Sequence, residues 1–364
     1  MKKKIQRPPA EIVYAKQLKQ LSTIDQDPVP PGWKLSPLAV EKFVLGDESL
    51  GIERKFVAPK GLVTRVIVTL ATNRGAMLIG KPGTAKSLLS ELLSTAISGS
   101  SALTIQGGTI TNINQLLYSW NEALLKTTGP CLEALIPSPL YQGMAEGKLV
   151  RFEEIARCSP KIQDGLLSLM SERQITVPEL SGKDAILYAR EGFNIIASSN
   201  TIDEGVYTMS AALKRRMNFE TILPIQNLAD ETDIIYRESE KLLKSSGVDL
   251  KIPTQSIDIL ATIFHELRNG QTLNGRSTDR LAGAIMSTAE AVTVAHALGV
   301  HAYYYCDGKI EPGDLMHFII GAAIKDNKDD NRRMRHYFET EVSQKEGIGW
   351  KEIFDQRHLL QGTH

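Results

Sequence analysis

The chain is 364 residues long, which is enough for two domains, and its 42% of apolar residues is typical of a globular protein. Lysine plus arginine equals aspartate plus glutamate at 42 each, so no overall field draws the chain to nucleic acid or to an acidic membrane. No segment approaches the roughly 18 apolar residues of a membrane span, the opening residues lack the apolar core of a secretory signal, and the three cysteines show no paired spacing. We therefore expect a cytoplasmic protein without a disulfide framework.

The first part of the chain, residues 1–45, is charged and rich in proline, and it predicts an N-terminal arm. One amphipathic helix is expected in it, near Ile12 to Leu21. A second helical pattern, Leu62 to Leu70, leads to a short apolar run, Ala76 to Ile79, which predicts a strand.

The eight residues after this strand, 80–87, read Gly-Lys-Pro-Gly-Thr-Ala-Lys-Ser and lead into a helical pattern. A strand, a glycine-rich loop and a helix that starts with Lys-Ser form a phosphate cradle, because loop N–H groups and the positive helix end face the phosphates. Lys86 can then reach the terminal phosphates, and the Ser87 hydroxyl can hold magnesium. The strict pattern has glycine where this chain has Ala85, so the motif needs support from elsewhere.

Apolar runs and helical patterns alternate after the loop, which predicts an α/β domain with a mainly parallel sheet. The predicted strands are 102–105, 148–152 and 192–198, and the predicted helices are 113–125 and 160–170. Two further apolar runs, 175–177 and 185–188, are separated by Ser-Gly-Lys-Asp and predict a hairpin.

Strand signals fade after about residue 225, and apolar residues at helical spacing predict a mainly helical second domain. Its predicted helices are 230–243, 256–267 and 281–298. The tail from residue 326 is highly charged and regains apolar spacing around Trp350 and Phe354. The predicted division is an arm (1–45), an α/β core (46–224), a helical lid (225–325) and a charged helical extension (326–364).

Polar side chains follow three of the predicted strands, and ligands of parallel sheets gather at these carboxyl ends. The first strand runs into Lys86 and Ser87, the second ends in Glu153 and Glu154, and the third ends in Asn200. Alone, each has a plain interpretation as a turn, a solvated strand end or surface charge. In this order they predict a site that hydrolyses a nucleoside triphosphate with magnesium and an activated water.

The segment Ser159 to Val177 resembles the signature of the MoxR branch of the AAA+ ATPases almost position for position. Glu153 to Arg157 is similar to that family's Asp-Glu-Ile-Asn-Arg, and Asn200 to Tyr207 resembles its Asn-Pro…Glu-Gly-Thr-Tyr segment. The resemblance covers roughly residues 55–325, and the family's loop commonly carries Ala-Lys-Ser, as here at Ala85. It implies a P-loop AAA+ core with a parallel sheet flanked by helices, followed by a smaller all-α lid.

The resemblance also implies roles for single residues. Glu153 takes the metal-facing acidic position with Ser87, and Glu154 takes the water-activating position. Asn200 matches sensor 1, and Arg216 matches the arginine finger, with Arg215 as the weaker candidate. The implied nucleotide-binding residues are Gly80, Lys81, Pro82, Gly83, Thr84, Ala85, Lys86, Ser87, Leu88 and, as sensor 2, Arg280 with Arg276 in reserve.

Two positions depart from the family pattern. Glu153 replaces aspartate and is one methylene longer, so its carboxylate must retract or act through water, because magnesium demands near-ideal octahedral geometry. Slow turnover is therefore expected. Met217 replaces the phenylalanine after the finger, which is a packing change.

Three functions from different classes are compatible with these features. The first is a ring-forming ATPase, a homo-hexamer by the resemblance, that binds ATP and Mg²⁺ and remodels a partner protein with a von Willebrand factor A domain. The second is a nucleotide-gated scaffold with little hydrolysis, which the Glu153 departure suggests. The third is a nucleic-acid motor, which zero net charge and the lack of a recognised DNA-binding element disfavour. A small-molecule kinase fits less well, because it would leave the finger and sensor segments without a role.

Overall fold

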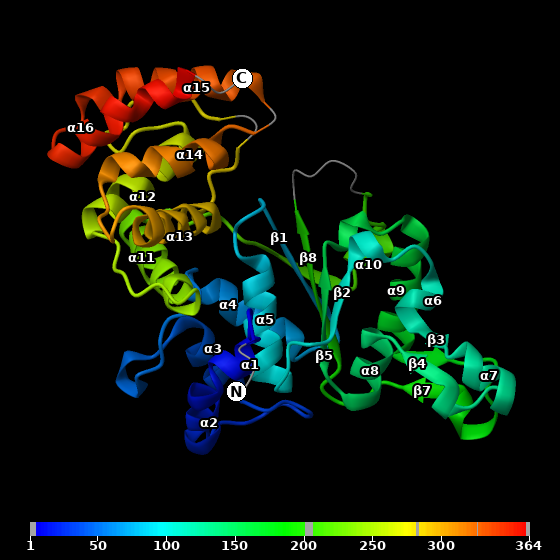
Figure 1. Ribbon diagram of the computed structural model, residues 1–364. Helices are drawn as coiled ribbons and strands as arrows, with labels where there is room; N and C mark the ends of the chain where they lie inside the picture. The colour runs from blue at the N-terminus through cyan, green and yellow to red at the C-terminus, as the bar shows by residue number, and fades with distance from the viewer. Residues whose placement is uncertain (1–4, 201–206, 282–283, 326, 362–364) are drawn as a thin grey trace. The chain divides into compact units, whose positions relative to one another are not determined.

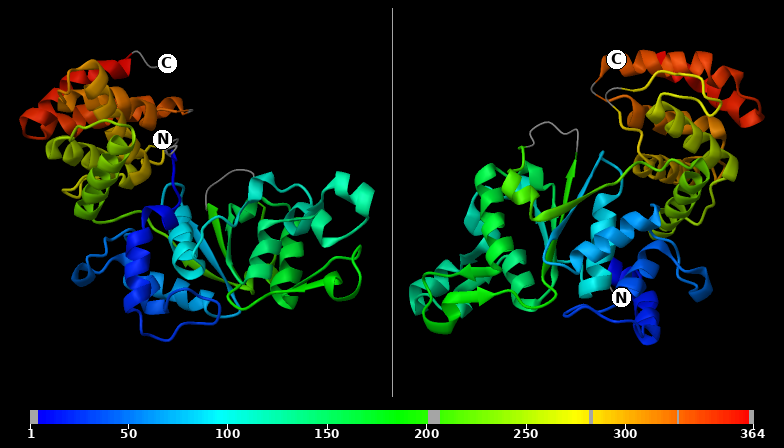
Figure 2. Two further views of the ribbon diagram at one scale, coloured as in Figure 1. Left: turned by 60° about the horizontal axis from the view of Figure 1, so that its bottom comes forward. Right: turned by 180° about the vertical axis from the view of Figure 1, so that it is seen from behind.

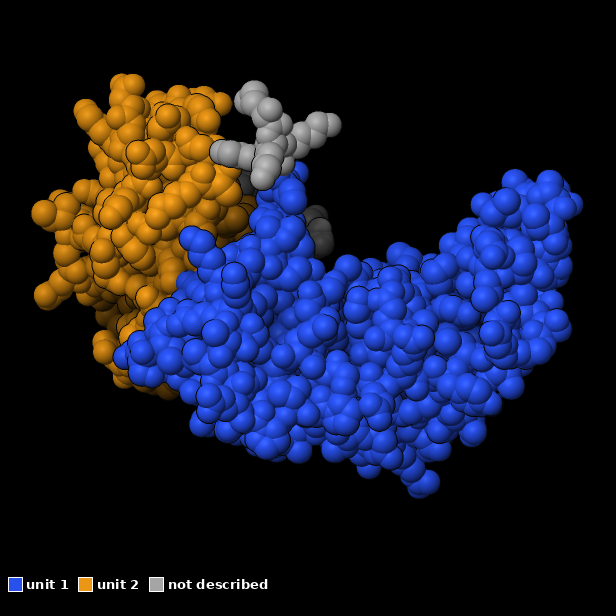
Figure 3. All heavy atoms as spheres, turned by 90° about the horizontal axis from the view of Figure 1, so that it is seen from below, with its two compact units in different colours: residues 1–81, 85–222 blue, residues 82–84, 223–364 orange. Residues whose placement is uncertain are grey.

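The computed structural model describes residues 5–200, 207–281, 284–325 and 327–361 (Figure 1). The chain forms two compact units, drawn in different colours in Figure 3. Unit 1 comprises residues 1–81 and 85–222, and unit 2 comprises residues 82–84 and 223–364. The two units are described separately below.

Unit 1 is built on a sheet of five parallel strands in the order β2-β5-β8-β1-β9. The strands are β1 (Gly75–Gly80), β2 (Thr104–Gln106), β5 (Leu149–Glu153), β8 (Asn194–Asn200) and β9 (Met217–Thr221). The predicted parallel α/β sheet is thus confirmed. The edge strand β9 was not predicted, because Met-Asn-Phe-Glu-Thr is a short run with a single strongly apolar pair.

Helices cover both faces of this sheet (Figures 1 and 2). On one face, α4 (Lys60–Leu70) and α5 (Lys86–Ser98) share a core with Leu78 and Leu149. On the other face, α8 (Pro139–Glu146) and α9 (Pro160–Glu172) share a core with Met77, Val150 and Phe152. Successive strand residues thus face opposite sides. Arg151 and Glu153, two and four residues after Leu149, accordingly face α5.

The predicted N-terminal arm is an integral part of unit 1. It contains three helices rather than one, namely α1 (Ala10–Val13), α2 (Ala15–Ile24) and α3 (Pro37–Leu45). Leu21, Phe43 and Val44 are buried in the core shared with α4 and α5. The Glu11 carboxylate accepts hydrogen bonds from the hydroxyls of Thr95 and Ser101. Buried apolar side chains therefore hold a segment whose charge and prolines suggested an appendage.

The predicted helix 113–125 is wrong, because a strand interrupts it. The chain forms α6 (Ile113–Leu117), β3 (Tyr118–Trp120) and α7 (Glu122–Thr128). Strand β3 pairs antiparallel with β4 (Leu135–Pro137), and its aromatic residues favour a strand over a helix. Asn121 caps the new helix by accepting from the N–H groups of Ala123 and Leu124.

The predicted hairpin is confirmed as β6 (Gln174–Thr176) paired antiparallel with β7 (Ile186–Tyr188). The short helix α10 (Ala211–Lys214) then precedes β9. The predicted helix 160–170 is confirmed as α9, which begins with Pro160 at its first helical position.

Unit 2 is helical, as predicted, and its described residues contain no strand beyond one isolated bridge. Its helices are α11 (Leu228–Ser245), α12 (Thr254–Asn269), α13 (Thr288–Tyr305), α14 (Leu315–Ala323), α15 (Lys328–Thr340) and α16 (Ile348–Asp355). Helix α13 begins at Thr288 rather than at 281, because Ser287 and Glu290 form a capping box there. Tyr337 and Ile353 from the tail are buried in the common core, so the tail belongs to unit 2.

A buried ion pair lies in the core of unit 2. Glu231 on α11 has no exposed surface and accepts two hydrogen bonds from the Arg268 guanidinium on α12, at 2.8 and 2.5 Å. Thr288 donates a third at 2.7 Å, and His265 Nδ1 lies 3.1 Å from the same carboxylate. Burial by itself raises the pKa of the Glu231 carboxyl, but these partners outweigh it and hold the pKa below its ordinary value.

Candidate active site

The phosphate loop joins the end of β1 to the first residue of α5, as the motif predicts. Ala85, the residue before the helix, has φ 61° and ψ 29°, which is the left-handed conformation. This conformation costs a non-glycine residue about 1–2 kcal/mol and explains why the strict motif has glycine there. Ala85 thus carries a backbone strain that the glycine of the strict motif would not.

Lys86 is almost fully buried at the carboxyl end of β1, with 5% of its surface exposed. Its Nζ donates hydrogen bonds to the carbonyl oxygens of Gly80, at 3.0 Å, and Lys81, at 2.9 Å. An ammonium group has three donors on a flexible stem, so it can exchange carbonyl partners for the oxygens of a phosphate. Its position fits the phosphate-binding role that the sequence predicts.

Glu153, the last residue of β5, lies at the centre of a buried polar cluster with 4% of its surface exposed. Its Oε2 accepts from the hydroxyls of Ser87, at 2.8 Å, and Ser198, at 2.6 Å. Its Oε1 accepts from Ser90 Oγ, at 2.7 Å, and from the Arg151 guanidinium, at 3.0 Å. The structure therefore brings together Ser87 and Glu153, the two residues predicted to face the metal.

The electrostatics of this cluster keep Glu153 ionised. Burial by itself raises the pKa of the Glu153 carboxyl, because a charge in a dry environment loses its hydration. Hydrogen bonds from Ser198 and Ser90, followed by the charge of Arg151 and the hydrogen bond from Ser87, outweigh that effect and lower the pKa below its ordinary value. Glu153 is thus an anion at neutral pH despite its burial.

Glu154 leaves the strand in the left-handed conformation, with φ 55°, so its side chain departs from the alternation of β5. Its Oε1 accepts from Asn200 Nδ2 at 2.9 Å, and its Oε2 lies 3.7 Å from Arg157 Nε. Its N–H donates to Ser198 Oγ at 3.2 Å. Neighbouring strands thus bring Glu154 and Asn200 together. Their contact orients a carboxylate that can take a proton from water.

The backbone of Glu154 also lies against Gly107, which follows β2 at the start of a 3-10 helix, Gly107–Thr109. A Cβ at Gly107 would lie 2.2 Å from the carbonyl oxygen of Glu154 and 3.3 Å from that of Glu153. Only glycine therefore permits this approach of the two chain segments.

Arg216 lies away from this cluster. The N–H of Gly75 donates to the Arg216 carbonyl at 3.0 Å, so Arg216 lies beside the start of β1, whereas Gly80 and Asn200 pair at its end. At ~3.3 Å per residue, the two ends of β1 are about 16 Å apart. The Arg216 guanidinium instead contacts Ser171, with Nε donating to Oγ at 3.0 Å.

The two sensor 2 candidates lie in unit 2 and differ in their contacts. Arg276 forms an ion pair with Glu341 at 2.7 Å and donates to Gln344 at 2.8 Å. Arg280, the preferred candidate, is exposed, and its carbonyl accepts from Arg333 at 3.1 Å. Residues 201–206, which carry most of the segment used to align Arg216 with the finger, lie outside the described residues.

Four residues of the site were missed by the sequence reasoning: Arg151, Ser90, Ser198 and Gly107. A signal was present for Arg151, because a charged residue inside an otherwise apolar strand shares a face with the residue two positions on. Ser198 likewise lies two residues before Asn200 on β8 and therefore shares a face of the strand with it. Ser90 and Gly107 are recognised only from the packing of α5 and of the loop after β2.

The donor set of the cluster fits magnesium. Ser87 and Glu153 present a hydroxyl and an ionised carboxylate, the hard oxygen ligands that this ion prefers. In the part of the chain that the structure describes, no group of three or more His, Cys, Asp or Glu side chains is arranged to hold a metal. Such a site relies on phosphate oxygens and water for its remaining ligands.

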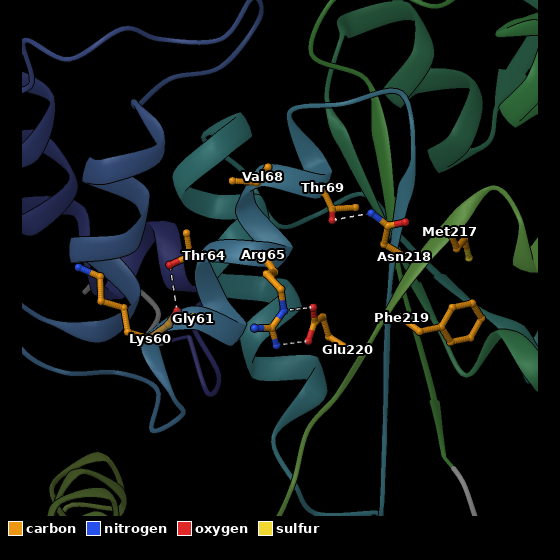
Figure 4. A pocket seen from close by; sticks show the side chains of 10 residues that line it. All are labelled: Lys60, Gly61, Thr64, Arg65, Val68, Thr69, Met217, Asn218, Phe219 and Glu220. Carbon is orange, nitrogen blue, oxygen red and sulfur yellow. Dashed lines mark hydrogen bonds and ion pairs between the residues drawn. The ribbon is translucent and has the colours of Figure 1, made fainter.

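A separate hollow of about 950 Å³ lies between α4 and β9 in unit 1 (Figure 4). None of the predicted nucleotide or metal residues lines it. Arg65 and Glu220 form a two-armed ion pair across it, at 2.6 and 2.7 Å. Asn218 Nδ2 donates to Thr69 Oγ1 at 3.0 Å at its other end. The hollow begins at Met217, directly after Arg216.

Among the described residues, no helix is long and apolar enough to cross a membrane.

Comparisons with known proteins agree with this geometry. Residues 75–217 match the AAA domain (dynein-related subfamily), and residues 229–361 match the YehL-like AAA+ ATPase C-terminal domain. YehL of Escherichia coli strain K12 is 52% identical over 98% of both chains. Chaperone MoxR1 of Mycobacterium tuberculosis is 27% identical over 57% of this chain, which spans 51% of MoxR1.

A solved structure supports the fold alone. NtrX from Brucella abortus in complex with ADP superposes with a TM-score of 0.51 at 13% identity. The match covers 84% of this chain and 62% of the NtrX chain. The full-length similarity to YehL and the two matched domain families show that the chain belongs to the YehL-like AAA+ ATPases of the MoxR family.

Proposed function

We propose that this ATPase works as a ring of identical subunits in which Arg216 of one subunit completes the ATP site of the next. The observation that supports this is the position of Arg216 beside the start of β1, about 16 Å from the strand end that holds the phosphate loop. An arginine side chain is much shorter than that distance. If Arg216 acts on ATP, it acts on the ATP of a neighbouring subunit.

The roles within one subunit follow from the contacts. Lys86 binds phosphate oxygens in place of the carbonyls that it contacts now, and Ser87 with Glu153 would hold magnesium. The magnesium ion supplies charge neutralisation for the phosphates when bound. Glu154, oriented by Asn200, takes the proton of the attacking water. Arg216 of the neighbour stabilises the charge that develops on the transferred phosphate.

Mixing two inactive variants tests the ring. Lys86→Ala removes phosphate binding but keeps the finger, and Arg216→Ala keeps the cradle but removes the finger. Each alone is expected to lose turnover, by about 10³–10⁵-fold for Arg216→Ala. A mixture is expected to regain activity, because an intact finger then meets an intact cradle. Arg215→Ala is the matched control and is expected to keep the wild-type rate.

The outcome of the mixing experiment is decisive in either direction. A mixture that stays inactive, or an Arg216→Ala variant with full turnover, contradicts an action between subunits. The number of subunits, six by the family resemblance, is checked by measuring the mass of the assembly with ATP bound. Loss of turnover on dilution to single subunits is expected for the same reason.

The work done by the ring is proposed to be the remodelling of a partner protein. The relative MoxR1 carries the name of a chaperone, and the family resemblance implies a partner with a von Willebrand factor A domain. Such a partner is expected to raise ATP turnover and to co-elute with the Glu154→Gln variant, which holds ATP without cleaving it. Stimulation by DNA instead of by this protein would support a nucleic-acid motor.

A further inference from the structure

Glu153 is one methylene longer than the aspartate of the family pattern, and its carboxylate is held in the cluster by Arg151 among others. Arg151 and Glu153 lie two residues apart on β5 and face the first turns of α5. Both side chains are nine-tenths buried or more. An arginine in the middle of a buried strand loses its hydration, so it persists where its donors are all engaged.

We propose that Arg151 is a positioning residue that, together with Ser90, holds Oε1 of Glu153 and thereby places Oε2 beside Ser87, where magnesium is to bind. Arg151 and Ser90 both contact Oε1, at 3.0 and 2.7 Å, whereas Ser87 and Ser198 contact Oε2, at 2.8 and 2.6 Å. The two oxygens of a carboxylate are joined at a fixed distance through one carbon, so holding Oε1 narrows the positions that Oε2 can take. The inference rests on the magnesium site of the proposed function.

The same guanidinium group also holds the other predicted ligand. Arg151 donates to the backbone carbonyl of Ser87 at 3.0 Å and to Ser90 Oγ at 3.0 Å. One side chain therefore connects Ser87 and Glu153 to each other, through a backbone bond on one side and a carboxylate bond on the other. Two weaker contacts, to the Ser101 carbonyl and to Thr104 at 3.4 Å, anchor the guanidinium to the segment at β2.

The extra methylene of Glu153 explains why such a clamp is needed. Glutamate has one more rotatable bond than aspartate, and an unrestrained carboxylate would sample several positions around the site. Hydrogen bonds from Arg151 and Ser90 to Oε1 restrict the positions that this longer side chain can take. Ser87, by donating its proton to Oε2, keeps its oxygen lone pairs for a metal ion.

The positive charge of Arg151 weakens Mg²⁺ binding, whereas its positioning of Glu153 strengthens it. The two effects therefore predict opposite changes in Mg²⁺ affinity when Arg151 is replaced. A nearby cation by itself repels Mg²⁺, so removal of the charge alone would tighten magnesium binding. Loss of a partner that orients a ligand weakens metal affinity by about 10–100-fold. If Arg151 acts by positioning Glu153, the Mg²⁺ concentration needed for half-maximal nucleotide binding (the Mg²⁺ requirement) rises in Arg151→Met. If its charge mainly repels Mg²⁺, this concentration falls.

The experiment measures Mg²⁺-dependent binding of a fluorescent ADP derivative to the full chain, without relying on turnover. Arg151→Met is expected to raise the Mg²⁺ concentration for half-maximal binding by about 10–100-fold. Arg173→Met is the matched control, since Arg173 also donates to two backbone carbonyls, of Phe193 and Asn73, but not to the cluster. Ser90→Ala removes the other donor to Oε1 with little change in volume, and its Mg²⁺ requirement is expected to rise as well.

A double-mutant cycle of Arg151→Met with Glu153→Asp tests whether the change in Mg²⁺ requirement depends on the length of the side chain at position 153. In that background the shorter carboxylate needs no retraction, so Arg151→Met is expected to change the Mg²⁺ requirement much less than in the wild type. An unchanged or lower requirement in both Arg151→Met and Ser90→Ala overturns the inference, as does an equal shift in the two backgrounds. Wild-type binding that does not depend on Mg²⁺ overturns the magnesium site itself, and the inference with it.

Discussion

Replacing Gly107 by alanine is expected to displace Glu154, the residue proposed to take the proton of the attacking water. A methyl group at Gly107 would lie 2.2 Å from the Glu154 carbonyl oxygen and 2.9 Å from its carbonyl carbon. It needs about 1.2 Å more to reach the 3.4 Å of an ordinary contact. The obstacle is backbone rather than the end of a flexible side chain, so one of the two chain segments must move by about that distance.

The expected effect on the reaction follows from that displacement. A misplacement of about 1 Å can cost about 10²-fold in rate, so kcat for phosphate release is expected to fall by about that factor. Overpacking costs about 1–3 kcal/mol of stability, measured as a shift in urea unfolding. Binding of the fluorescent ADP is expected to persist, because Lys86 and Ser87 both lie at the start of α5 and not at this contact.

The neighbouring glycine provides a matched control. A Cβ at Gly108 meets only Arg157 Cδ at 3.7 Å, an ordinary contact, so Gly108→Ala is expected to keep wild-type turnover and stability. If Gly107→Ala turned over ATP as fast as Gly108→Ala, the reasoning from the contact to the position of Glu154 would be refuted. A loss of ADP binding as large as the loss of kcat would also contradict it.

Glu154→Gln keeps the size of the side chain but removes the proposed base. Turnover is therefore expected to fall about 10²–10⁴-fold, with ADP binding retained. Glu172→Gln, at an exposed position, is the control and is expected to keep wild-type turnover. Unchanged turnover would favour the scaffold function. Arg268→Met leaves the buried Glu231 without its charged partner. It is expected to lower the free energy of unfolding, measured in urea, by about 3–5 kcal/mol. The control Arg237→Met removes a more exposed ion pair and is expected to lower it by at most about 1 kcal/mol. Similar losses in both would contradict a buried pair. The lowered pKa of Glu231 stabilises the folded chain fully above the ordinary value of 4.5, and this contribution is lost as the pH falls through the lower folded value. Urea unfolding of the wild type is therefore expected to be more sensitive to acid in that range than that of Arg268→Met, and equal sensitivity would refute this assignment.

Much of the candidate site was predictable because its motifs are local. The cradle from Gly80 to Ser87 needs only a strand, a loop and a helix in sequence, and each has its own pattern of residues. Glu153 and Asn200 were predictable as strand ends, because the carboxyl ends of parallel strands share one edge of a sheet. Helices α11 and α12 of unit 2 were predicted from apolar spacing, since an amphipathic face is encoded within the helix itself, whereas α14, α15 and α16 were not predicted individually.

Other elements depend on partners that are distant in the sequence. Tyr118–Trp120 is a strand because Leu135–Pro137 pairs with it, and β9 is a strand because β1 offers an open edge. Charge and prolines in the first 45 residues suggested an arm, although Phe43 and Leu21 contribute to the core of unit 1. Local composition cannot show which apolar residues find a buried partner.

The sequence by itself predicted the strand, loop and helix around residues 80–87, the two carboxylates at the end of β5 and the family, because these depend on residues that are adjacent or regularly spaced. The tertiary structure alone decided that Arg151 and Ser90 hold one oxygen of Glu153, that Asn200 holds Glu154, and that Gly107 leaves room for it. It also decided that Arg216 lies at the far end of β1 from the phosphate loop. Each of these depends on the order of strands in the sheet, which distant pairings set and no local pattern encodes.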